Sequence, residues 1–471
     1  MDVSLRQSRR ERLNDTPNPG PAAAAMIDLR STLADPRRYR RPIERLFDRT
    51  LLSPARHALR QDGVSLGALF DNQRRVSRLL ARAVASGRYE FAPGRVRRIL
   101  VEGKARDVYA FRLTDLLIHA AVAEIVEEAA RPLFSSSLFS YRPGLSWVDA
   151  VSLFGSYIRR FRGAEPDPRR RGLYVIRRDI DAYTDSIPVD AASPLWPMLW
   201  RLFDPDGMPP PVPARTVVEE VVRPLVAAQS GGAFRLIRGV PTGQPISCVL
   251  FNLYLHELDR TLGSFPGAFY ARYSDDILFA HRDPLTTAEA AAEIERAAGR
   301  LGLLLKKEKS QDLFLTAAGR GPGPDRPAER GTAFIPFLGV DVAADGTIAL
   351  GREKTRALLR DLADRTSRTA RILRGQPADR IGKAVCGVIN RALKPGPGPF
   401  RQRSADILHD IVTFRPQLRH LDHLIARIVL HAVTGKDSPR AFRQVPYKTI
   451  RRDWGLVSLL HGRNRARERR S

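Results

Sequence analysis

Residues 271–280 read ARYSDDILFA and place two adjacent aspartates, Asp275 and Asp276, between two apolar runs. Apolar runs on either side of a short polar tip predict a tight β-hairpin. Two carboxylates about 4 Å apart repel each other by about 4 kcal/mol at an effective dielectric constant near 20. A solvated turn tolerates such a pair, because aspartate is a common turn residue. The pair alone therefore fits either an ordinary turn or a site that binds a cation.

A third acid stands at the end of another predicted strand. Residues 173–180, LYVIRRDI, begin with a buried apolar run and bring Asp179 to the strand's end. Clustered carboxylates persist where a divalent cation neutralises them, and oxygen-only ligands favour Mg²⁺ or Mn²⁺. Two such ions, about 3.5–4 Å apart and bridged by carboxylates, serve in-line phosphoryl transfer. The three acids thus predict a two-metal site for this chemistry.

The overall composition favours a nucleic-acid partner. The chain has 471 residues, 43% of them hydrophobic, and a formal net charge of +27. A field of that sign concentrates polyanions. Most of the excess is arginine, which a GC-rich genome also produces, so base composition is the alternative explanation.

The cysteine content and the apolar runs predict a cytoplasmic protein. Cys248 and Cys386 are far apart, which excludes a disulfide framework and a zinc knuckle and suits a reducing compartment. No apolar run is long enough to span a membrane, and the N-terminus lacks the apolar segment of a signal peptide.

Helical and strand patterns alternate irregularly along the chain. Residues 1–25 are rich in basic residues, Pro and Ala, which predicts disorder. Helical periodicity is expected at 114–128, 247–262 and 286–302, and paired strands at 333–350. This irregular order predicts an α+β fold with a mixed or antiparallel sheet.

The order of the motifs resembles the palm of reverse transcriptases, of the bacterial kind found in retrons, group II introns and the defence-associated "unknown group". The resemblance covers roughly residues 87–350, and the ordered set is far more specific than any one motif. In chain order it rests on GKAR (103–106), SYRPGLSWVDAV (140–151), DIDAYTDSIP (179–188), GVPTGQPISCVLFNLYLHELD (239–259), YSDD (273–276), Lys309 and FLG (337–339).

The resemblance implies a right-hand polymerase whose palm carries an antiparallel sheet with a catalytic hairpin. Its domains are expected as a flexible basic leader (1–40), N-terminal helices and fingers (41–165), a palm with a fingers insertion near 190–235 (166–350), and a helical basic thumb and tail (351–471). Two cysteines cannot form the zinc site of an HNH-type endonuclease, so none is expected.

The resemblance also implies the metal ligands. Asp179 and Asp275 would each bind both Mg²⁺ ions, with Mn²⁺ as the alternative metal. Asp276 would complete the set, and the carbonyl of Ile180 is an expected extra ligand.

Five further residues are expected around the nucleotide and the primer. Arg106 would grip the triphosphate, since its planar fork binds phosphate oxygens in pairs, and Lys104 would lie nearby. Lys309 would donate a proton to the pyrophosphate. Tyr273 would pack beneath the primer terminus, and Gly243 would let the backbone approach the nucleotide. Each basic residue taken alone would be read as an ordinary surface charge.

Three departures from the family pattern stand out. The aromatic that usually screens out the ribose 2′-hydroxyl is replaced by Thr184, with Tyr183 just before it. The usual glutamine of the PQG motif is Thr242, and the segment SYRPG is shorter than the group II intron form. Discrimination against ribonucleotides therefore depends on whether Tyr183 reaches the sugar.

The function expected from the resemblance is RNA-directed DNA polymerisation on a dedicated non-coding RNA in antiphage defence. The expected partners are an RNA template, a primer, the DNA product and dNTPs, with no membrane partner. The alternatives are an RNA-dependent RNA polymerase, a template-independent polymerase, and an RNA-binding maturase or scaffold with a vestigial polymerase site. The sequence leaves the oligomeric state and the priming mechanism open.

Overall fold

The structure is a computed structural model. It describes residues 26–48, 60–101, 104–167, 170–228, 231–318, 330–394, 403–436 and 438–460. The chain divides into two compact units: unit 1 comprises Met1–Ser146 and Ile176–Gln311, and unit 2 comprises Trp147–Val175 and Asp312–Ser471. Each unit is described by itself.

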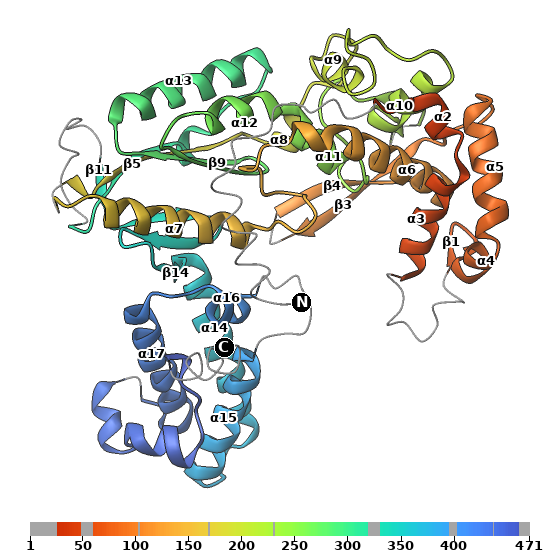
Figure 1. Ribbon diagram of the computed structural model, residues 1–471. Helices are drawn as coiled ribbons and strands as arrows, with labels where there is room; N and C mark the ends of the chain where they lie inside the picture. The colour runs from red at the N-terminus through yellow and green to blue at the C-terminus, as the bar shows by residue number, and fades with distance from the viewer. Residues whose placement is uncertain are drawn as a thin grey trace. The chain divides into compact units, whose positions relative to one another are not determined.

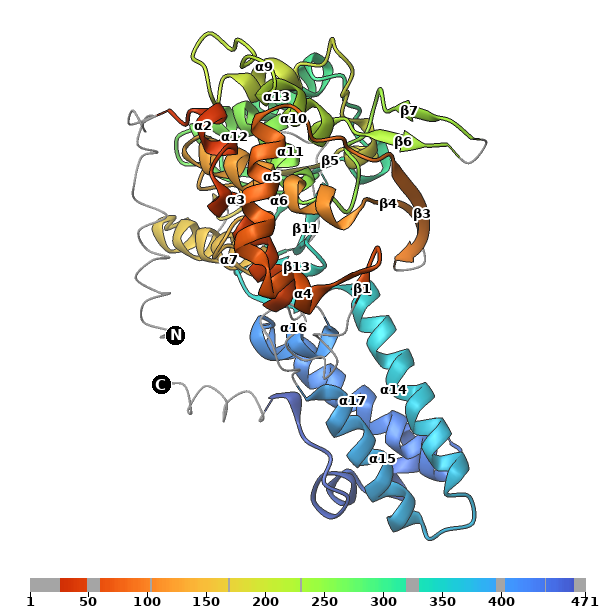
Figure 2. The ribbon, with the colours of Figure 1, turned by 90° about the vertical axis from the view of Figure 1, so that its right-hand side faces the viewer.

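Unit 1 is built around one buried helix, α6 (Leu113–Ala130). Its buried side chains, among them Ile118, Val122 and Ile125, lie on all sides of the helix. A helix that is apolar all round is stable only when other elements cover it, and α3 lies beside it in Figure 2. The elements in contact with α6 include α2 (Leu29–Leu33), α3 (Pro36–Asp48), α10 (Ala214–Val222) and α11 (Ser247–Tyr254).

The remaining helices of unit 1 are short, apart from α5 and α13. They are α4 (Leu66–Asp71), α5 (Gln73–Ala85), α8 (Tyr183–Ser186), α9 (Leu195–Trp200), α12 (His256–Gly263), α13 (Pro284–Arg300) and the 3-10 turns Arg131–Leu133 and Lys307–Lys309.

One sheet of unit 1 combines a basic strand pair with two strands from the region near 190–235, where the fingers insertion is expected. β3 (Gly94–Val101) and β4 (Lys104–Ala110) are antiparallel, and β6 (Leu225–Ala227) runs parallel to β3. β7 (Ala233–Arg235) completes the order β4-β3-β6-β7, which Figure 2 shows from the side. The basic stretch at 94–110 therefore forms an antiparallel strand pair. A separate small hairpin joins β1 (Arg60–Gln61) to β2 (Val64–Ser65).

The predicted hairpin at the acidic pair is present in unit 1. β8 (Phe269–Tyr273) and β9 (Asp276–His281) are antiparallel, with Tyr273 opposite Asp276. Helices α12 and α13 cover this hairpin (Figure 1). β5 (Leu173–Asp179) is the neighbour of β9 on the side away from β8. The division between the units falls within β5, and its acidic end belongs to unit 1.

Unit 2 contains the remaining strands. β10 (Gln311–Leu315) and β11 (Arg330–Thr332) are parallel, and Tyr174 of β5 packs its ring against Phe314. The paired strands expected at 333–350 are β12 (Phe334–Phe337), β13 (Val340–Ala343) and β14 (Ile348–Leu350), all antiparallel. Helix α7 (Trp147–Ala164) packs on β13.

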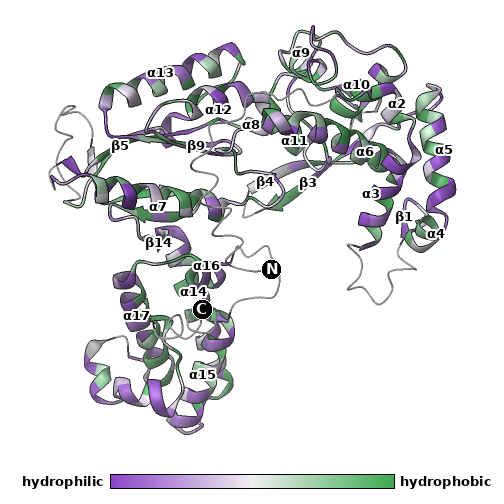
Figure 3. Cartoon of the chain, viewed as in Figure 1, coloured by the Kyte–Doolittle hydropathy of each residue, from purple (hydrophilic) through white to green (hydrophobic). Residues whose placement is uncertain are grey.

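The C-terminal part of unit 2 is a helical bundle, as the sequence predicts. α14, α15 and α17 each bury an apolar stripe, including Leu362, Ile389 and Ile425, and leave polar faces outward (Figure 3). The helices are α14 (Arg352–Ile372), α15 (Ala378–Leu393), α16 (Ser404–Asp410) and α17 (Arg415–Thr434), followed by the 3-10 helix Pro439–Arg443 and the π-helix Thr449–Asp453.

Two expectations need correction. Residues 29–33 and 36–40 of the predicted flexible leader are helical, because Asp28 caps α2 and Leu29, Leu33 and Tyr39 are buried. The helix expected at 247–262 is two helices, broken at Leu255, whose φ of −112° and ψ of 9° are not helical. The predicted disorder of residues 1–25 lies outside the described residues, and the proposed domain boundaries stay predictions.

The two cysteines are free, Cys386 buried and Cys248 half-buried. Within the described residues, no helix is both long enough and apolar enough to cross a membrane.

Gly382 in α15 allows a close approach that a larger residue would prevent. A Cβ at this position would overlap the indole ring of Trp454, which is itself fixed by a 2.9 Å hydrogen bond from its Nε1 to Asp379. We expect Gly382→Ala to lower the free energy of unfolding by about 1–3 kcal/mol. Urea denaturation followed by tryptophan fluorescence measures this change.

Gly387 is the matched control in the same helix. A Cβ there would come no closer than 3.5 Å to Arg391, so Gly387→Ala should raise stability by about 0.5–1 kcal/mol. Equal stability of the two variants would contradict the packing described for Gly382.

Candidate active site

The turn of the β8–β9 hairpin consists of Ser274 and Asp275. Ser274 has a φ of 59°, the left-handed conformation that the first position of such a turn needs. A non-glycine residue in this region is strained and persists only where its surroundings hold it. Ser274 is 9% exposed, so the surrounding structure encloses this turn.

The fold brings Asp179 beside this turn. The N–H of Ile180 donates to the carbonyl of Asp275 at 3.4 Å. On the other side, the carbonyl of Asp179 accepts from the N–H of Lys306 at 2.8 Å. Asp179 itself is buried. The three predicted acids therefore lie together, at the end of β5 and at the adjoining β8–β9 turn.

Among the described residues, Lys309 and Arg177 pair with these acids. Lys309 Nζ lies 2.5 Å from Asp179 Oδ2, and Arg177 Nη2 lies 3.5 Å from Asp276 Oδ1. Although burial disfavours the Lys309 ammonium, Asp179 outweighs it and the pKa of Lys309 is raised. The sequence argument named Lys309 but missed Arg177, whose signal was its place two residues before Asp179 on the same strand.

Lys309 and Arg177 do not neutralise all three carboxylates. Burial raises the pKa of Asp275, and the charge of Asp179 raises it further. Burial also raises the pKa of Asp276 to about 6, although Arg177 acts against this shift. Three acids with two cations therefore leave a residual demand for positive charge.

The donor set fits an oxygen-preferring divalent cation in kind. Asp179, Asp275 and Asp276 supply only carboxylate oxygens, which suits Mg²⁺ or Mn²⁺. In the described part of the chain, no three acidic, histidine or cysteine side chains are gathered closely enough to hold a metal ion as they stand. The contact of Lys309 with Asp179 means that this lysine would have to give way to an incoming ion.

Tyr183 is buried, whereas the neighbouring Thr184 is half-buried. Tyr183 is 3% exposed, and its hydroxyl donates to the carbonyl of Phe251 at 2.6 Å. Because a buried hydroxyl needs a partner, this bond holds Tyr183 in the core. Thr184 is half-buried, and its carbonyl accepts from the N–H of Val240 at 2.9 Å.

Gly243 lies against the strand that carries the predicted triphosphate-binding residues. It has a φ of 101°, and a Cβ there would lie 3.0 Å from Val108 Cγ1 of β4. The neighbouring Thr242 accepts a 3.0 Å hydrogen bond from the N–H of Tyr109. Glycine thus allows the loop before α11 to meet β4.

Lys104 and Arg106 are placed only through their backbones. They lie on β4 opposite Val101 and Ile99, respectively. Their side chains are outside the described residues.

Tyr273 has an aromatic neighbour that sequence reasoning did not single out. The ring centroid of Tyr141 lies 6.5 Å from that of Tyr273. Tyr141 is 47% exposed and has a φ of 54°. Its signal was an aromatic residue directly before the Arg-Pro-Gly of the quoted segment SYRPG.

A buried ion pair beneath the turn was also missed. Arg272 and Asp259 are both fully buried, with 2.6 Å between Nη2 and Oδ2. A charged pair inside two otherwise apolar patterns, on α12 and β8, was the available signal.

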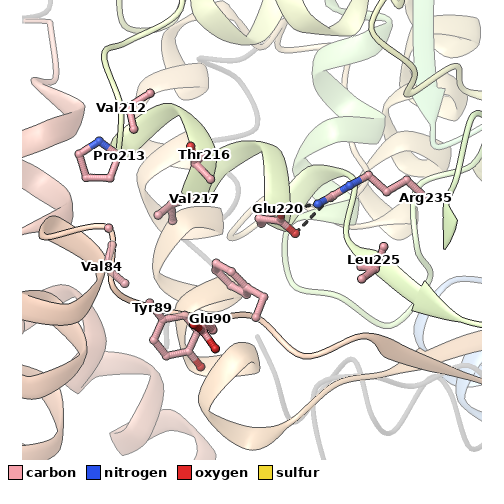
Figure 4. Close-up of a pocket in the computed structure, with 12 residues that line it drawn as sticks. Val84, Tyr89, Glu90, Val212, Pro213, Thr216, Val217, Glu220, Leu225 and Arg235 are labelled. Atoms are coloured by element: carbon pink, nitrogen blue, oxygen red, sulfur yellow. Dashed lines mark hydrogen bonds and ion pairs between the residues drawn. The ribbon is translucent and has the colours of Figure 1, made fainter. Parts of the chain in front are cut away.

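A pocket of about 430 Å³ in unit 1 contains none of the predicted site residues. Figure 4 shows it beside the ion pair of Glu220 and Arg235, with Tyr89 and Val217 on its walls. It is therefore separate from the acidic cluster.

Residues 118–342 match the family model described as "Reverse transcriptase (RNA-dependent DNA polymerase)". This part of the chain is similar to the reverse transcriptase domain, and members of that family are RNA-directed DNA polymerases, a class of nucleotidyltransferase. The match confirms the predicted fold class, an α+β right-hand polymerase.

A curated relative is similar over a shorter stretch. The "Uncharacterized 91 kDa protein in cob intron" of Schizosaccharomyces pombe is 25% identical over 193 residues, which is 40% of this chain. The aligned stretch spans about a fifth of that relative, 21% of its length.

Solved telomerase structures show a distant likeness. The apo telomerase of Candida tropicalis, truncated from its C-terminal domain, is 15% identical, with a TM-score of 0.41 and 55% of each chain covered. The telomerase of Candida albicans with a fragment of telomeric RNA is 12% identical, with a TM-score of 0.41, covering 78% of this chain and 62% of the other. Nothing about the activity of this chain follows from these likenesses.

The raised pKa of Asp275 has a consequence for stability. A carboxyl whose pKa is raised by folding loses stability as the pH rises through that pKa. In EDTA at about pH 7.5, we expect Asp275→Asn to exceed the wild type in stability by about 0.5–2 kcal/mol. The difference should vanish near about pH 3, where the wild-type carboxyl is protonated in both states. Chemical denaturation at the two pH values measures it.

The exposed Asp206 provides a control for this prediction. The variant Asp206→Asn should show no comparable gain. A wild type as stable as Asp275→Asn at both pH values would contradict the repulsion described between Asp275 and Asp179.

Proposed function

We propose that this chain is an RNA-directed DNA polymerase that adds dNTPs to a primer 3′ end by two-metal-ion catalysis. The observation that supports it most is the contact of Ile180 with Asp275, which sets Asp179 beside the hairpin turn within a reverse transcriptase domain. A vestigial domain would have no need to keep three mutually repelling acids.

Asp179, Asp275 and the carbonyl of Ile180 would hold two Mg²⁺ or Mn²⁺ ions. When bound, these ions would lower the pKa of the attacking hydroxyl and stabilise the charge of the pyrophosphate. Asp276, paired with Arg177, would complete the acidic set.

Lys309 would supply a proton. Its ammonium is held at Asp179, and its raised pKa keeps it protonated at neutral pH. Once displaced from Asp179, it would donate a proton to the pyrophosphate as the leaving group departs.

Arg106, with Lys104 nearby, would bind the triphosphate from β4. Gly243 supports this role, because it brings the loop before α11 into contact with the same strand. Tyr273, with Tyr141 beside it, would pack against the primer terminus.

The template and the biological setting extend the proposal. The resemblance to retron and defence-associated enzymes favours a dedicated non-coding RNA and a role in antiphage defence. The net charge of +27 and the basic helices of unit 2 would hold nucleic acid through phosphate contacts that weaken with salt.

A second candidate function is RNA-dependent RNA polymerisation. The observation that favours it is the core position of Tyr183, which leaves the smaller Thr184 at the place where an aromatic would exclude the 2′-hydroxyl. Primer extension with either dNTPs or NTPs distinguishes the two functions.

The acids provide the first test of the proposal. We expect Asp179→Ala and Asp275→Ala each to lower primer extension on an RNA template by at least about 1000-fold, because the metal ions would lose a shared ligand. Gel analysis of a labelled primer with dNTPs and Mg²⁺ measures this loss. Undiminished extension by Asp275→Ala would contradict the proposal, and unchanged biological activity would support a scaffold instead.

Thr184 provides a test of sugar selection. We expect Thr184→Phe to raise the preference for dNTPs over NTPs by about 10-fold, because the larger ring would meet the 2′-hydroxyl. Single-nucleotide incorporation rates with dGTP and GTP give this ratio, with Thr369→Phe in α14 of unit 2 as control. An unchanged ratio would show that Thr184 does not face the sugar.

A further inference from the structure

Arg272 is the largest fully buried side chain among the described residues. Its guanidinium forms a fork with Asp259, with Nε 2.7 Å from Oδ1 and Nη2 2.6 Å from Oδ2. Asp259 also accepts a 2.6 Å hydrogen bond from the Tyr270 hydroxyl. Such a pair is retained in a core only with full hydrogen bonding, because both charges have left water.

The same guanidinium reaches two backbone carbonyls. Nη1 donates to Ser274 at 3.0 Å, and Nη2 donates to Asn252 at 3.2 Å. Asn252 lies in the last turn of α11, just before the break at Leu255. Helix carbonyls at such an end need partners from outside the helix, and Arg272 supplies one.

The Ser274 carbonyl belongs to the peptide that leads into Asp275. Fixing this oxygen fixes the plane of that peptide, and so the direction in which Asp275 leaves the turn. Ser274 is strained, with a φ of 59°, so the turn needs an external contact to hold this conformation. The Arg272 bond is such a contact, and it comes from beneath the turn rather than from the acidic face.

The backbone of Arg272 also anchors its strand. Its N–H donates to the carbonyl of Ser137 and its own carbonyl accepts from the N–H of Phe139, both at 3.0 Å. The adjacent Ser140 exchanges hydrogen bonds with the Asn252 side chain, at 2.9 and 3.1 Å. One residue thus connects the catalytic turn, the helix break and the segment that leads to Tyr141.

From this geometry we infer that Arg272 is a positioning residue: held by Asp259, its guanidinium fixes the Ser274 carbonyl and thereby aims Asp275 at Asp179. The inference rests on the proposed polymerase activity for its kinetic consequence, but the geometry of the turn can be tested separately.

The chain contains a matched comparison in the same unit. Tyr89, Asp115 and Arg112 form a cluster of the same three residue types, with 2.7 Å from the Tyr89 hydroxyl to Asp115 and 3.1 Å from Arg112 Nε, although the Arg112 side chain is 49% exposed. Arg112 likewise donates to a backbone carbonyl, that of Glu90. None of the hydrogen bonds described for this cluster reaches the hairpin turn. Removing it therefore tests for a loss of stability alone, without a loss of contacts to the turn.

The test compares two triple variants that each remove a whole cluster. One is Arg272→Met, Asp259→Leu and Tyr270→Phe, and the other is Arg112→Met, Asp115→Leu and Tyr89→Phe. Removing both charges together leaves no unpaired ion in the core, and such replacements often preserve the fold. Arg272→Lys is the fallback, because it keeps the charge but loses the planar fork.

We expect the Arg272 triple variant to fold, with kcat for primer extension lowered about 10- to 100-fold and KM for dNTP nearly unchanged, because the acids are misplaced. Amide hydrogen exchange at residues 273–276 should speed up. The Arg112 triple variant should keep the wild-type kcat and the wild-type exchange at this turn. Where the Arg272 triple variant does not fold, Arg272→Lys should show the same kcat loss and faster exchange.

Wild-type kcat and wild-type exchange at 273–276 in the folded Arg272 variant would overturn the inference. Equal kcat losses in both triple variants would also overturn it, since the effect would then be general destabilisation. A wild type that extends no primer would refute the proposed function instead, and hydrogen exchange at the turn would still decide the role of Arg272.

Discussion

Repulsion among the carboxylates of Asp179, Asp275 and Asp276, where β5 ends beside the β8–β9 turn, is the constraint on which the rest of the site depends. Asp179 at the end of β5 and the acidic pair at the hairpin turn are held together by the backbone contact of Ile180 with Asp275. Burial raises the pKa of both hairpin acids. The strands and helices around them must therefore supply the free energy that keeps the carboxylates close.

The chain meets this constraint in two ways. Lys309 and Arg177 approach the acids directly and neutralise part of their charge. Arg272 acts from beneath, by holding the backbone of the turn in its strained conformation. The first contacts lower the net charge of the acidic cluster, whereas the second holds the backbone of the turn.

Local patterns were enough to predict the elements that carry the site. Alternating apolar residues around Asp275 predicted the hairpin, and the buried run before Asp179 predicted β5, because these signals are local. Side-chain partners across the fold were not predictable, since the fork of Arg272 on Asp259 joins residues from α12 and β8. The break at Leu255 was missed because the apolar spacing of 247–262 continues through it. The place of Tyr183 within DIDAYTDSIP (179–188) did not predict that its hydroxyl donates to the carbonyl of Phe251 in the core.

Exposed and buried charges of this chain respond differently to ionic strength: salt weakens the contacts of exposed charges and leaves those of buried charges unchanged. Basic side chains on the outer faces of unit 2 are exposed, and mobile ions screen their attraction to phosphates over about 10 Å at 0.1 M salt. Arg272 and Asp259 are both 0% exposed, so mobile ions cannot come between them. Under the proposed function, raising the ionic strength would therefore weaken nucleic-acid binding while the β8–β9 turn keeps its shape. The charges proposed to bind nucleic acid are exposed to solvent, whereas the charges that hold the turn are buried.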